Sequence, residues 1–487
     1  MMILKDLIKK SFPDQSGLEG IPPIPIQSIE CDSRRVKPGS LFVAIDGAVS
    51  DGKKYISDAI AQGAVAVVSD GPNMEAHPVP WIQIADGRAA VAQLASIFYD
   101  EPSKQMTVIG ITGTNGKTTS SYLVEYFLRQ LQISCGVIGT ISYRYDGQEV
   151  AAVETTPGAI KIQSILADMR DRGCRYVAME ASSHALDQKR VDQIRFSTAL
   201  FTNLTQDHLD YHKTFEAYFE SKAKLFAGLD PQATAVINTD DPWGQKLLTR
   251  TQAKVIGYGV GDEAQMRATH LVFTAKGSEY DLQFQGKKIH VSSPLVGLHN
   301  IYNVLGALAV VASLGLSWES AAASLGRFPG VPGRLESVDL GQEFGVYIDF
   351  AHTPDGLRNV LSATKSSARQ KLIVVFGCGG DRDRTKRPLM AKIAAEYSDN
   401  VIVTSDNPRS EDPRVITEEI CVGFPSSFKN FSVVIDRRKA IRQALLSARS
   451  GDVVLLAGKG HERSQIIAGV AHPFSDREEV ERVLSGR

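Results

Sequence analysis

The sequence predicts an α/β protein organised in three domains, with mainly parallel sheets. Short β-branched runs alternate with helical patterns almost from end to end, which is typical of parallel strands joined by crossover helices. The length of 487 residues corresponds to about three domains of roughly 150 residues. A hydrophobic content of 43% and a charged content of 22% are ordinary for a folded protein, so we expect ordered structure throughout.

The first predicted domain, residues 1–104, is a small α/β unit. We expect strands at Leu41–Ile45, Ala64–Val68 and Trp81–Ile84, and helices at Tyr55–Gln62 and Arg88–Tyr99. Gly63 directly follows the first of these helices and suits the position where a helix ends in a left-handed residue. The polar stretch Asp100–Gln105 ends the domain.

The second predicted domain, residues 105–332, opens with an apolar strand, a glycine-rich loop and a helix. The strands expected here are Met106–Ile111, Tyr176–Met179 and Thr198–Phe201, and the helices are Lys117–Gln130 and His299–Leu314. The alternating segment Arg267–Val291 predicts antiparallel strands, with Gly277 and Gly286 as turn positions. Phe328–Gly333 holds two prolines and two glycines, which favours a connection between domains.

The third predicted domain, residues 333–487, repeats the alternation of strand and helix and is expected to be Rossmann-like. Its core strands are predicted at Val346–Asp349, Leu372–Phe376, Val401–Thr404, Val433–Ile435 and Val453–Leu456. Ligands of open α/β sheets gather at the carboxyl ends of such strands. The polar residues that follow the strands are therefore the first candidates for a site.

Charge and cysteine content exclude several classes of function. Lys and Arg number 54 and Asp and Glu 55, so the net charge of −1 gives no polycationic surface for nucleic acid. Five widely spaced cysteines form no metal-binding pair and no disulfide framework. The charged N-terminal segment lacks the features of a secretory signal, and no apolar run is long enough to span a bilayer. We expect a cytoplasmic protein.

A phosphate loop is the clearest motif. Gly110-Ile-Thr-Gly-Thr-Asn-Gly-Lys-Thr-Thr119 lies between a predicted strand and helix, where backbone amides and a helix N-terminus face an anion. Lys117 would reach the outer phosphates, and the Thr118 hydroxyl would ligate magnesium. Ile111 replaces the first glycine of the strict pattern, and Gly110 and Gly113 partly compensate. The alternative is an ordinary turn with an exposed lysine.

Carboxylates and histidines at strand ends are candidate metal ligands. Glu180 ends an apolar strand, at the position of the metal-holding acid in other phosphate-loop enzymes; a capping or solvated acid is the alternative. His208 and His212 have the spacing of a helical zinc pair. Without a Cys or a His-Glu-x-x-His arrangement, magnesium is the better prediction, and surface or capping histidines are the other possibility.

Together, the motifs resemble the Mur ligases, in an order and spacing that cover nearly the whole chain. The residues that carry the resemblance are the phosphate loop, Met179–His184, Asn203–His212, Gly297–Asn303, Pro332–Arg334, Asp349–Pro354 and Gly458–Glu462. The resemblance implies an ADP-forming amide ligase, expected to be monomeric. Its three domains would bind a UDP-linked substrate, ATP and an incoming amino acid, respectively.

The resemblance also assigns the ATP and metal sites by position. ATP would be bound by Gly113, Thr114, Asn115, Gly116, Lys117, Thr118, Thr119, Asn300, Arg334 and Asp349. Mg²⁺ would be held by Thr118, Glu180, His208 and Lys222, the last as a carbamate formed with CO2. Lys117, His208 and Lys222 are the expected catalytic residues. For Lys222, the alternative is a lysine that merely solvates a helix face, like nearby Lys224.

The UDP-muramoyl peptide site matches the family less closely. The resemblance places it on Ser33, Ala48, Val49, Ser50, Thr155, Thr156, Ser182, Gln188 and Arg190. Many members have Asn before the Thr-Thr-Pro segment, where this chain has Glu154. We therefore do not expect Glu154 to make the contact that a side-chain amide makes in those members.

Asp406-Asn-Pro-Arg409 resembles the signature of family members that add meso-diaminopimelate to UDP-N-acetylmuramoyl-L-alanyl-D-glutamate. The amino-acid site implied is Arg382, Asp406, Asn407, Pro408, Arg409, Gly458 and Glu462. Arg409 is suited to bind the second carboxylate of diaminopimelate, and Glu462 is suited to pair with its distal ammonium group. The alternative is that Asp406–Arg409 form an ordinary Asn-Pro turn without a role in binding. Other functions considered are addition of L-lysine, folate polyglutamylation and a nucleotide switch that hydrolyses ATP without ligation.

Overall fold

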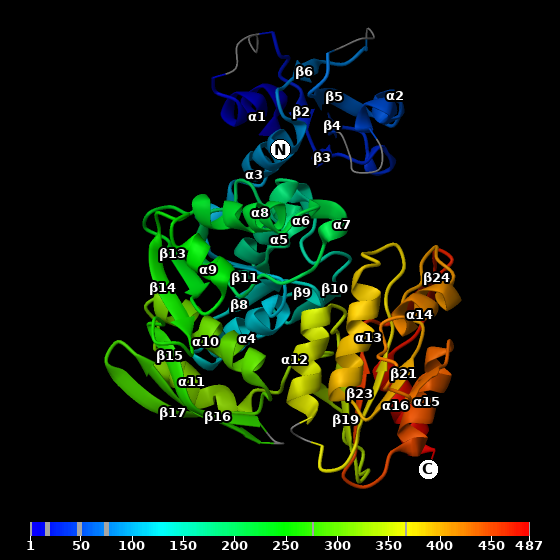
Figure 1. Cartoon of the computed structure of the whole chain (residues 1–487). Coiled ribbons are helices and arrows are strands. Elements are labelled where there is room, and N and C mark those ends of the chain that lie inside the picture. The colour runs from blue at the N-terminus through cyan, green and yellow to red at the C-terminus, as the bar shows by residue number, and fades with distance from the viewer. Residues whose placement is uncertain are drawn as a thin grey trace. The chain divides into compact units, whose positions relative to one another are not determined.

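The computed structural model describes residues 2–14, 20–45, 51–72, 77–274, 277–365 and 368–486 (Figure 1). Ala48, Val49 and Ser50 of the expected UDP site lie outside these residues. The chain divides into two compact units, each described by itself. The first unit comprises Met1–Gly110, Ile133–Ala199 and Lys224–Ala233, and the second comprises Ile111–Gln132, Leu200–Ala223 and Thr234–Arg487.

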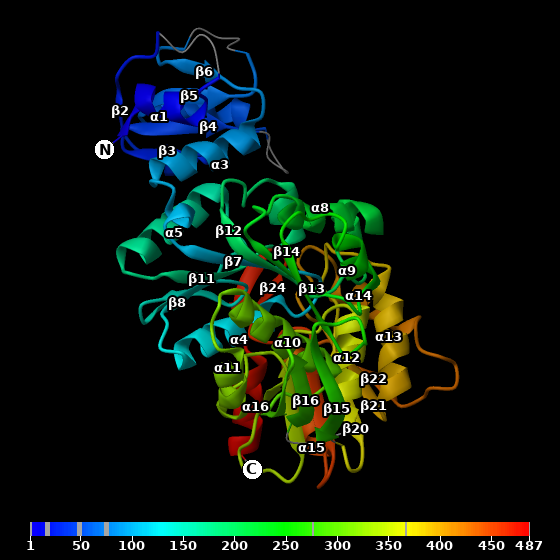
Figure 2. The ribbon, with the colours of Figure 1, turned by 90° about the vertical axis from the view of Figure 1, so that its left-hand side faces the viewer.

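The N-terminal part of the first unit is a parallel sheet in the order β3-β4-β5-β6. Its elements are β1 Met2–Ile3, α1 Leu4–Ser11, β2 Pro25–Ile26, β3 Ser28–Glu30, β4 Ser40–Ala44, α2 Ile56–Ala61, β5 Ala64–Ser69, β6 Trp81–Gln83 and α3 Gly87–Phe98. Figure 2 shows α3 alongside β3 and β4. Along β4, Leu41 and Val43 join the core under α1 and α3, while Phe42 and Ala44 join the core under α2. Both faces of the sheet are thus covered.

The glycine expected to end the second helix does so. Gly63 has a φ of +104°, and its neighbour Gln62 is the last helical position before it. A Cβ on Gly63 would lie 2.8 Å from the Cα of Pro38, so the position favours glycine for conformation and for space. The helix itself is preceded by a 3₁₀ turn, Gly52–Tyr55.

The central part of the chain contains the largest sheet, whose described strands follow the order β10-β9-β8-β11-β7-β12-β13-β14-β15-β16-β17. Its strands are β7 Thr107–Thr112, β8 Cys135–Ile138, β9 Ser142–Tyr145, β10 Gln148–Ala151, β11 Tyr176–Glu180, β12 Phe196–Phe201, β13 Thr234–Asn238, β14 Lys254–Gly259, β15 Met266–Thr274, β16 Gly277–Phe284 and β17 Lys287–Ser293. Its helices are α4 Lys117–Gln130, α5 Ala159–Asp171, α6 Ser183–Asp187, α7 Leu209–His212, α8 Phe215–Ala227, α9 Pro242–Leu247, α10 Leu298–Ser313 and α11 Trp318–Ser324.

The antiparallel segment predicted in this part is confirmed. Strands β15, β16 and β17 pair antiparallel, and Gly286, with a φ of +74°, forms the turn between the last two. Gly277 begins β16, and the two residues before it lie outside the described chain. The antiparallel β9–β10 hairpin was not predicted.

The C-terminal part is a six-stranded sheet in the order β18-β19-β23-β20-β21-β22, counted over the described residues. All neighbours after β18 pair in parallel. Its strands are β18 Glu336–Ser337, β19 Gly345–Asp349, β20 Leu372–Phe376, β21 Asn400–Val403, β22 Phe431–Val433, β23 Val453–Ala457, β24 Ser464–Ile467 and β25 Val470–Pro473, the last two forming a separate hairpin. Its helices are α12 Pro354–Lys365, α13 Lys386–Tyr397, α14 Pro413–Cys421, α15 Arg437–Ser447 and α16 Asp476–Ser485.

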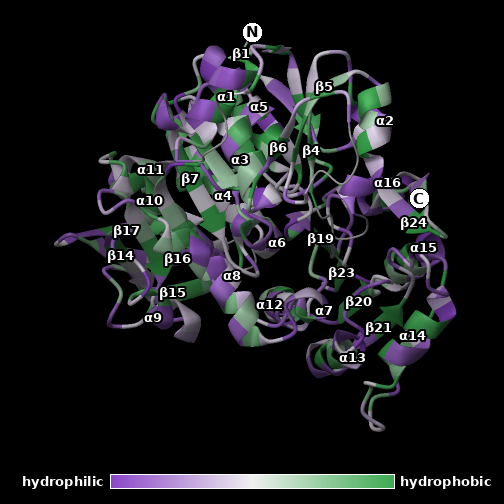
Figure 3. Cartoon of the chain, turned by 90° about the horizontal axis from the view of Figure 1, so that it is seen from above, coloured by the Kyte–Doolittle hydropathy of each residue, from purple (hydrophilic) through white to green (hydrophobic). Residues whose placement is uncertain are grey.

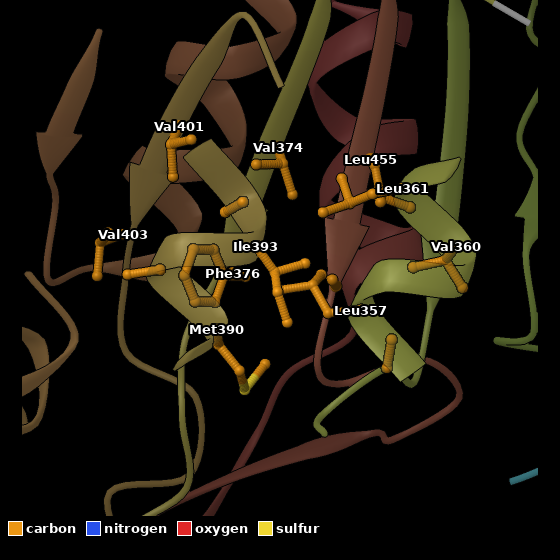
Figure 4. Packing of buried hydrophobic residues seen from close by; sticks show 14 of the residues in the cluster. Leu357, Val360, Leu361, Val374, Phe376, Met390, Ile393, Val401, Val403 and Leu455 are labelled. Atoms are coloured by element: carbon orange, nitrogen blue, oxygen red, sulfur yellow. The ribbon is translucent and has the colours of Figure 1, made fainter. Parts of the chain in front are cut away.

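Alternation along the strands builds a core on each face of this sheet. In β20, Val374 and Phe376 pack with α12 and α13 (Figure 4), whereas Ile373 and Val375 pack with α15. Sheets buried on both faces need strands that are apolar at every position. In Figure 3, β21 is accordingly coloured as mainly hydrophobic. The α/β class and the organisation in three domains are confirmed, while the domain boundaries stay a prediction.

Most predicted elements lie within one or two residues of the observed ones. The strand expected at Val433–Ile435 is wrong by two positions, because pairing sets the register of β22, with Phe431 opposite Val401. Across the described part of the chain, no helix combines the length and apolar character needed to cross a bilayer.

The connection at Phe328–Gly333 is closely packed at its end. Gly333 has a φ of +64°, and a Cβ there would lie 2.1 Å from the amide nitrogen of His461 and 2.5 Å from the carbonyl carbon of Gly460. The carbonyl oxygen of Gly333 accepts a hydrogen bond from the amide of Phe350 at 2.9 Å. Residue 333 is therefore part of the C-terminal packing.

Candidate functional site

The phosphate loop lies in the second unit, between the end of β7 and the start of α4, as predicted. Gly113 has a φ of +149°, and a Cβ there would lie 1.8 Å from the Oγ1 atom of Thr202. Gly116 has a φ of +87°, and its Cβ would lie 2.3 Å from the Oδ1 atom of Asn303. Both positions therefore exclude a side chain, and the loop that they shape leads into the N-terminus of α4, which is the kind of helix end that binds anions.

Two lysines converge on this loop. The Nζ atom of Lys117 donates to the carbonyl oxygens of Gly113, at 2.8 Å, and of Thr114, at 3.0 Å. Lys222, from α8, also donates to the Gly113 carbonyl at 2.8 Å and is almost completely buried. Burial, together with the charge of Lys117, lowers the pKa of Lys222 well below its usual value. Lys222 is therefore suited to the neutral form, which is the form that captures CO2.

Arg334 lies at the α4 end of the loop, and Asp349 lies close enough to Arg334 to feel its charge. The Nη2 atom of Arg334 donates to the hydroxyl of Thr118 at 3.1 Å, and its guanidinium lies over the ring of Phe350. Asp349 accepts hydrogen bonds of 2.6 Å from the amides of Leu335 and Ala351. Burial raises the pKa of Asp349 to about 6, although Arg334 opposes this.

The remaining predicted ATP contacts use their polar groups within the protein. The Nδ2 atom of Asn300 donates to the carbonyl of Val296 at 2.9 Å, and its Oδ1 atom accepts from Asn303. Asn115 donates through Nδ2 to Asp355 at 2.9 Å, and the Thr114 hydroxyl lies 3.1 Å from that of Tyr218. Thr119 is buried in the first turn of α4. These bonds fix the loop and α10 in place.

His208 belongs to a cluster of ionisable side chains around Asp207. His208 has a φ of +55°, its ring lies 3.3 Å from the Asp207 carboxylate, and the ring of His352 lies 3.9 Å from the same group. Burial opposes ionisation of Asp207, but His208, His352 and Lys386 outweigh it and lower the pKa to about 2. Neither Asp207 nor Lys386 was predicted from the sequence as a site residue. In the sequence, nothing except its place in a basic segment distinguishes Lys386 from other lysines.

Glu180 lies in the first unit, at the end of β11. Its Oε1 and Oε2 atoms accept hydrogen bonds from the amide and the hydroxyl of Thr140, at 3.0 and 2.8 Å. The side chain is fully buried, and a Cβ on Gly139 would lie 2.4 Å from Oε1. A buried, oriented carboxylate of this kind fits a hard cation such as Mg²⁺. In the described residues, no three His, Cys, Asp or Glu side chains cluster closely enough to hold a metal by themselves.

The residues of the first unit that were predicted to bind the UDP-linked peptide form one hydrogen-bonded group. Arg190 donates through Nε and Nη2 to Gln188 Oε1, at 3.1 and 2.9 Å, and through Nη1 to the Thr156 carbonyl at 2.9 Å. The same Nη1 atom pairs with Glu154 at 2.8 Å. Glu154, which replaces the asparagine found in many family members, thus pairs with a residue of the same group.

Hydroxyl groups connect the rest of this group to Glu180. Thr156 donates to the Glu180 carbonyl at 2.7 Å and accepts from the Ser182 amide at 3.0 Å. The hydroxyl of Thr155 lies 3.1 Å from that of Thr140. Ser33 is buried at the start of a separate 3₁₀ turn, Ser33–Arg35, in the N-terminal part.

The predicted amino-acid site gathers at the carboxyl ends of neighbouring parallel strands. Arg382 follows β20, Asp406–Arg409 follow β21, and Gly458 and Glu462 follow β23. Such an edge, next to the point where strand order reverses, is where open α/β sheets bind ligands. The structure thus brings these residues to one edge of the sheet.

A buried lysine that the sequence analysis left unassigned connects two of these loops. Lys459 is fully buried and donates to Asn407 Oδ1 at 3.0 Å and to Glu462 Oε2 at 2.6 Å. Asn407 also donates to Glu462 at 2.8 Å. Among the described residues, the Oδ2 atom of Asp406 is buried without a hydrogen-bond partner. A buried carboxylate oxygen in this state favours an added donor such as an ammonium group.

The two arginines of the site are held by backbone carbonyls. Arg409 has a φ of +54° and donates through Nη1 to the Gly380 carbonyl at 2.8 Å, and Arg382 donates to the Asp381 carbonyl at 2.9 Å. Burial and the charge of Arg382 lower the pKa of Arg409. Two neighbouring cations of this kind favour an anionic ligand. Pro408 supplies a backbone contact, since a Cβ on Gly380 would lie 1.9 Å from its carbonyl oxygen.

Three family models match the chain. The Mur ligase family catalytic domain matches residues 25–99, the Mur ligase middle domain matches 111–311, and the Mur ligase glutamate ligase domain matches 333–460.

Curated relatives match over nearly the full length. A UDP-N-acetylmuramoyl-L-alanyl-D-glutamate--2,6-diaminopimelate ligase of Geobacter metallireducens is 44% identical over an alignment 502 positions long, which covers 98% of each chain. The ligase of the same name from Gloeobacter violaceus is 46% identical and covers 100% of this chain and 99% of its own.

Solved structures share the fold. A structure of a ligase of that name has a TM-score of 0.70, 33% identity and coverage of 98% of both chains. A folylpolyglutamate synthase of Mycobacterium tuberculosis, complexed with ADP and AMPPCP, has a TM-score of 0.65 at 18% identity and covers 82% of this chain, which is evidence for the fold alone. On the family models and the full-length relatives, the chain belongs to the Mur ligase family.

Proposed function

We propose that this chain is an ATP-dependent, ADP-forming amide ligase that adds meso-diaminopimelate to UDP-N-acetylmuramoyl-L-alanyl-D-glutamate, in cytoplasmic synthesis of peptidoglycan precursors. The observation that carries the proposal is the combination of a phosphate loop with acidic and basic loops at one edge of the C-terminal sheet, in a chain 44% identical to a ligase of that name. We expect it to act as a monomer.

The chemistry requires activation of a carboxylate. A carboxylate resists attack by an amine because its oxygen leaves poorly. Transfer of the γ-phosphoryl group of ATP to the substrate carboxylate forms an acyl phosphate and releases ADP. The amine then attacks the acyl carbon, loses a proton, and displaces inorganic phosphate. In the first step two anions must approach each other, and the charge of Lys117 beside the loop offsets their repulsion.

The residues proposed to hold Mg²⁺ are Thr118, Glu180, His208 and Lys222 as its carbamate. When bound, magnesium would neutralise the charge of the phosphates and polarise the γ-phosphoryl group that is transferred. The buried carboxylate of Glu180 and the lowered pKa of Lys222 support this assignment. A carbamate would turn a cationic side chain into an anionic oxygen ligand next to the loop.

The proposed contacts to the UDP-linked substrate are Ser33, Ala48, Val49, Ser50, Thr155, Thr156, Ser182, Gln188 and Arg190. Arg190 is the principal charge in this set. Its three bonds to Gln188 and Thr156 orient the guanidinium, which supports a role in gripping an anionic part of the substrate.

The proposed amino-acid site distinguishes diaminopimelate from lysine by its second carboxylate. Arg409 and Arg382 supply cations for carboxylate groups, and Asp406 and Glu462 supply anions for amines. The buried, unbonded Oδ2 atom of Asp406 supports the acceptor role. Addition of L-lysine is the second candidate, because lysine shares every group except that carboxylate.

A substrate panel tests the proposal. Purified protein is given ATP and Mg²⁺ with each combination of the UDP-muramoyl dipeptide, diaminopimelate, lysine, and a folate with glutamate. We expect ADP release only with the dipeptide and diaminopimelate together, and a UDP-muramoyl tripeptide by mass spectrometry. ADP release without either substrate would instead identify a nucleotide switch.

A further inference from the structure

Among the described residues of the C-terminal part, two arginines are fully buried, and one of them, Arg387, bonds to the loop after β20 of the proposed amino-acid site. Arg387, near the start of α13, is inaccessible to solvent. It forms a two-point pair with Glu411, from Nη1 to Oε2 at 2.9 Å and from Nη2 to Oε1 at 2.8 Å. Nη1 also donates to Glu419 at 2.6 Å. Even a paired buried cation adds little net stability over apolar packing, because desolvation offsets the attraction, so this arrangement favours a role beyond stability.

Glu411 is the point at which the two arginine-bearing loops meet. Its Oε1 atom accepts a hydrogen bond of 2.6 Å from the amide of Asp381, the residue before Arg382. Its own amide donates to the carbonyl of Pro408, the residue before Arg409, at 3.0 Å. One side chain thus connects the loop after β20 with the loop after β21.

Further bonds join the same two loops. The hydroxyl of Ser410 donates to Asp381 Oδ1 at 2.6 Å, and the amide of Gly380 donates to the carbonyl of Asn407 at 2.9 Å. Asp381 and Arg409 both have φ values of +54°. Residues other than glycine adopt this region at a cost, so surrounding contacts must maintain it.

We propose that Glu411, held by the buried Arg387, is a positioning residue that sets the separation of Arg382 and Arg409 and thereby selects an amino acid with two carboxylates. This inference rests on the proposed function. A fixed separation between two cations favours a ligand whose carboxylates span it, and an amino acid with one carboxylate gains only half of the contacts. None of the described bonds of Glu411 goes to the side chain of Arg382 or Arg409, so Glu411 acts on them through the loop backbone.

The chain supplies a matched control in Glu419. Glu419 also pairs with Arg387, and with Arg384 in the loop after β20, but it lies on α14 and none of its described bonds reaches the loop after β21, so it does not join the two loops. Glu411→Gln and Glu419→Gln therefore remove the same charge from the same arginine, and only the first weakens the connection between the loops.

The test is steady-state kinetics of wild type, Glu411→Gln and Glu419→Gln with all three substrates. We expect Glu411→Gln to raise the KM for diaminopimelate about tenfold, and to lower the preference for diaminopimelate over lysine by a similar factor. Its kcat and its KM values for ATP and the UDP-muramoyl dipeptide should stay within about twofold of wild type. Glu419→Gln should behave as wild type in all of these.

Hydrogen exchange gives a second readout. Amides in 378–382 and 407–411 should exchange faster in Glu411→Gln and not in Glu419→Gln. If Glu411→Gln does not fold, Ser410→Ala removes a different bond between the same loops and should shift the KM for diaminopimelate in the same direction, by about threefold. Equal effects of the Glu411 and Glu419 variants, or a parallel rise in all three KM values, would overturn the inference. A wild-type protein that adds no diaminopimelate would instead overturn the proposed function.

Discussion

The Nζ atom of Lys222 lies 2.8 Å from the carbonyl oxygen of Gly113, although the two residues are 109 positions apart in the chain. The Nζ atom of Lys117 lies at the same distance from the same oxygen. Two amines that share one acceptor repel each other when both are protonated, and Lys222 is the more deeply buried of the two. The fold therefore keeps a lysine with a lowered pKa against the phosphate loop.

The carbamate proposed on Lys222 would make activity depend on CO2. We expect Lys222→Met to lower kcat on the order of a hundredfold, as loss of a metal ligand does. Wild type depleted of CO2 should lose activity in parallel and recover on addition of bicarbonate. ¹³C NMR with labelled bicarbonate should give a carbamate signal that the variant lacks. Lys224→Met, which removes a surface pair with Asp187, is the control and should retain activity. Full activity in Lys222→Met would exclude the carbamate.

Arg409 is expected to recognise the second carboxylate of diaminopimelate. Arg409→Ala should raise the KM for diaminopimelate on the order of a hundredfold, because a charge-assisted pair is lost. The KM for lysine should change much less. Arg414→Ala, at an exposed position of α14, is the control. Discrimination against lysine that stays at the wild-type ratio in Arg409→Ala would refute the assignment.

The phosphate loop tolerates no side chain at residue 116. Gly116→Ala places a Cβ 2.3 Å from Asn303 Oδ1 at a φ of +87°, so the loop must move away from its anion-binding geometry. We expect the KM for ATP to rise by at least about tenfold. Gly173→Ala introduces the same change at a φ of +79° with nothing within 4 Å, and should cost about 1 kcal/mol of stability without affecting the KM for ATP. Similar kinetics for the two variants would contradict the prediction.

The raised pKa of Asp349 predicts a pH dependence of stability. Its pKa rises from 3.8 to about 6 in the folded protein, so the folded state binds the proton more tightly than the unfolded state. Stability from this group is greatest below pH 4 and declines as pH rises through about 6, by about 3 kcal/mol in total. Asp349→Asn should remove this decline. Urea unfolding from pH 4 to 7 measures it, with Asp339→Asn at an exposed position as control. Parallel pH profiles for wild type and Asp349→Asn would be inconsistent with the shift.

Sequence patterns were sufficient where one local rule decides the structure. The loop and helix from Gly113 to Gln130 follow from glycine spacing and apolar periodicity, and the helix has the expected bounds. The strands of the C-terminal sheet follow from continuous apolar runs. The register of β22 did not follow, because Val433 and Ile435 are as apolar as Phe431, and only pairing with β21 distinguishes them.

Residues whose roles depend on distant partners could not be found in this way. Lys459 lies 52 positions from Asn407, and Glu411 lies 24 positions from Arg387. In the sequence each is an ordinary charged residue with no periodic signal. Burial of a charge is decided by tertiary packing, so these roles become visible only when the loops are brought together. The hairpins β9–β10 and β24–β25 were missed because their strands are short and largely polar or exposed.

The packing of Gly333 has a consequence for how the C-terminal domain can swivel. Because residue 333 is wedged against Gly460 and His461, it must rotate with that domain. The amide of Arg334 also donates to the carbonyl of Val331 at 3.1 Å, so a pivot in this connection would fall before Val331, where the ring of Pro329 locks its own φ torsion. Gly330, with a φ of +86° and open space around its Cα, is left as the joint with the widest torsional range. A rotation about the bonds of Gly330 would therefore move the 458–462 loop together with residue 333.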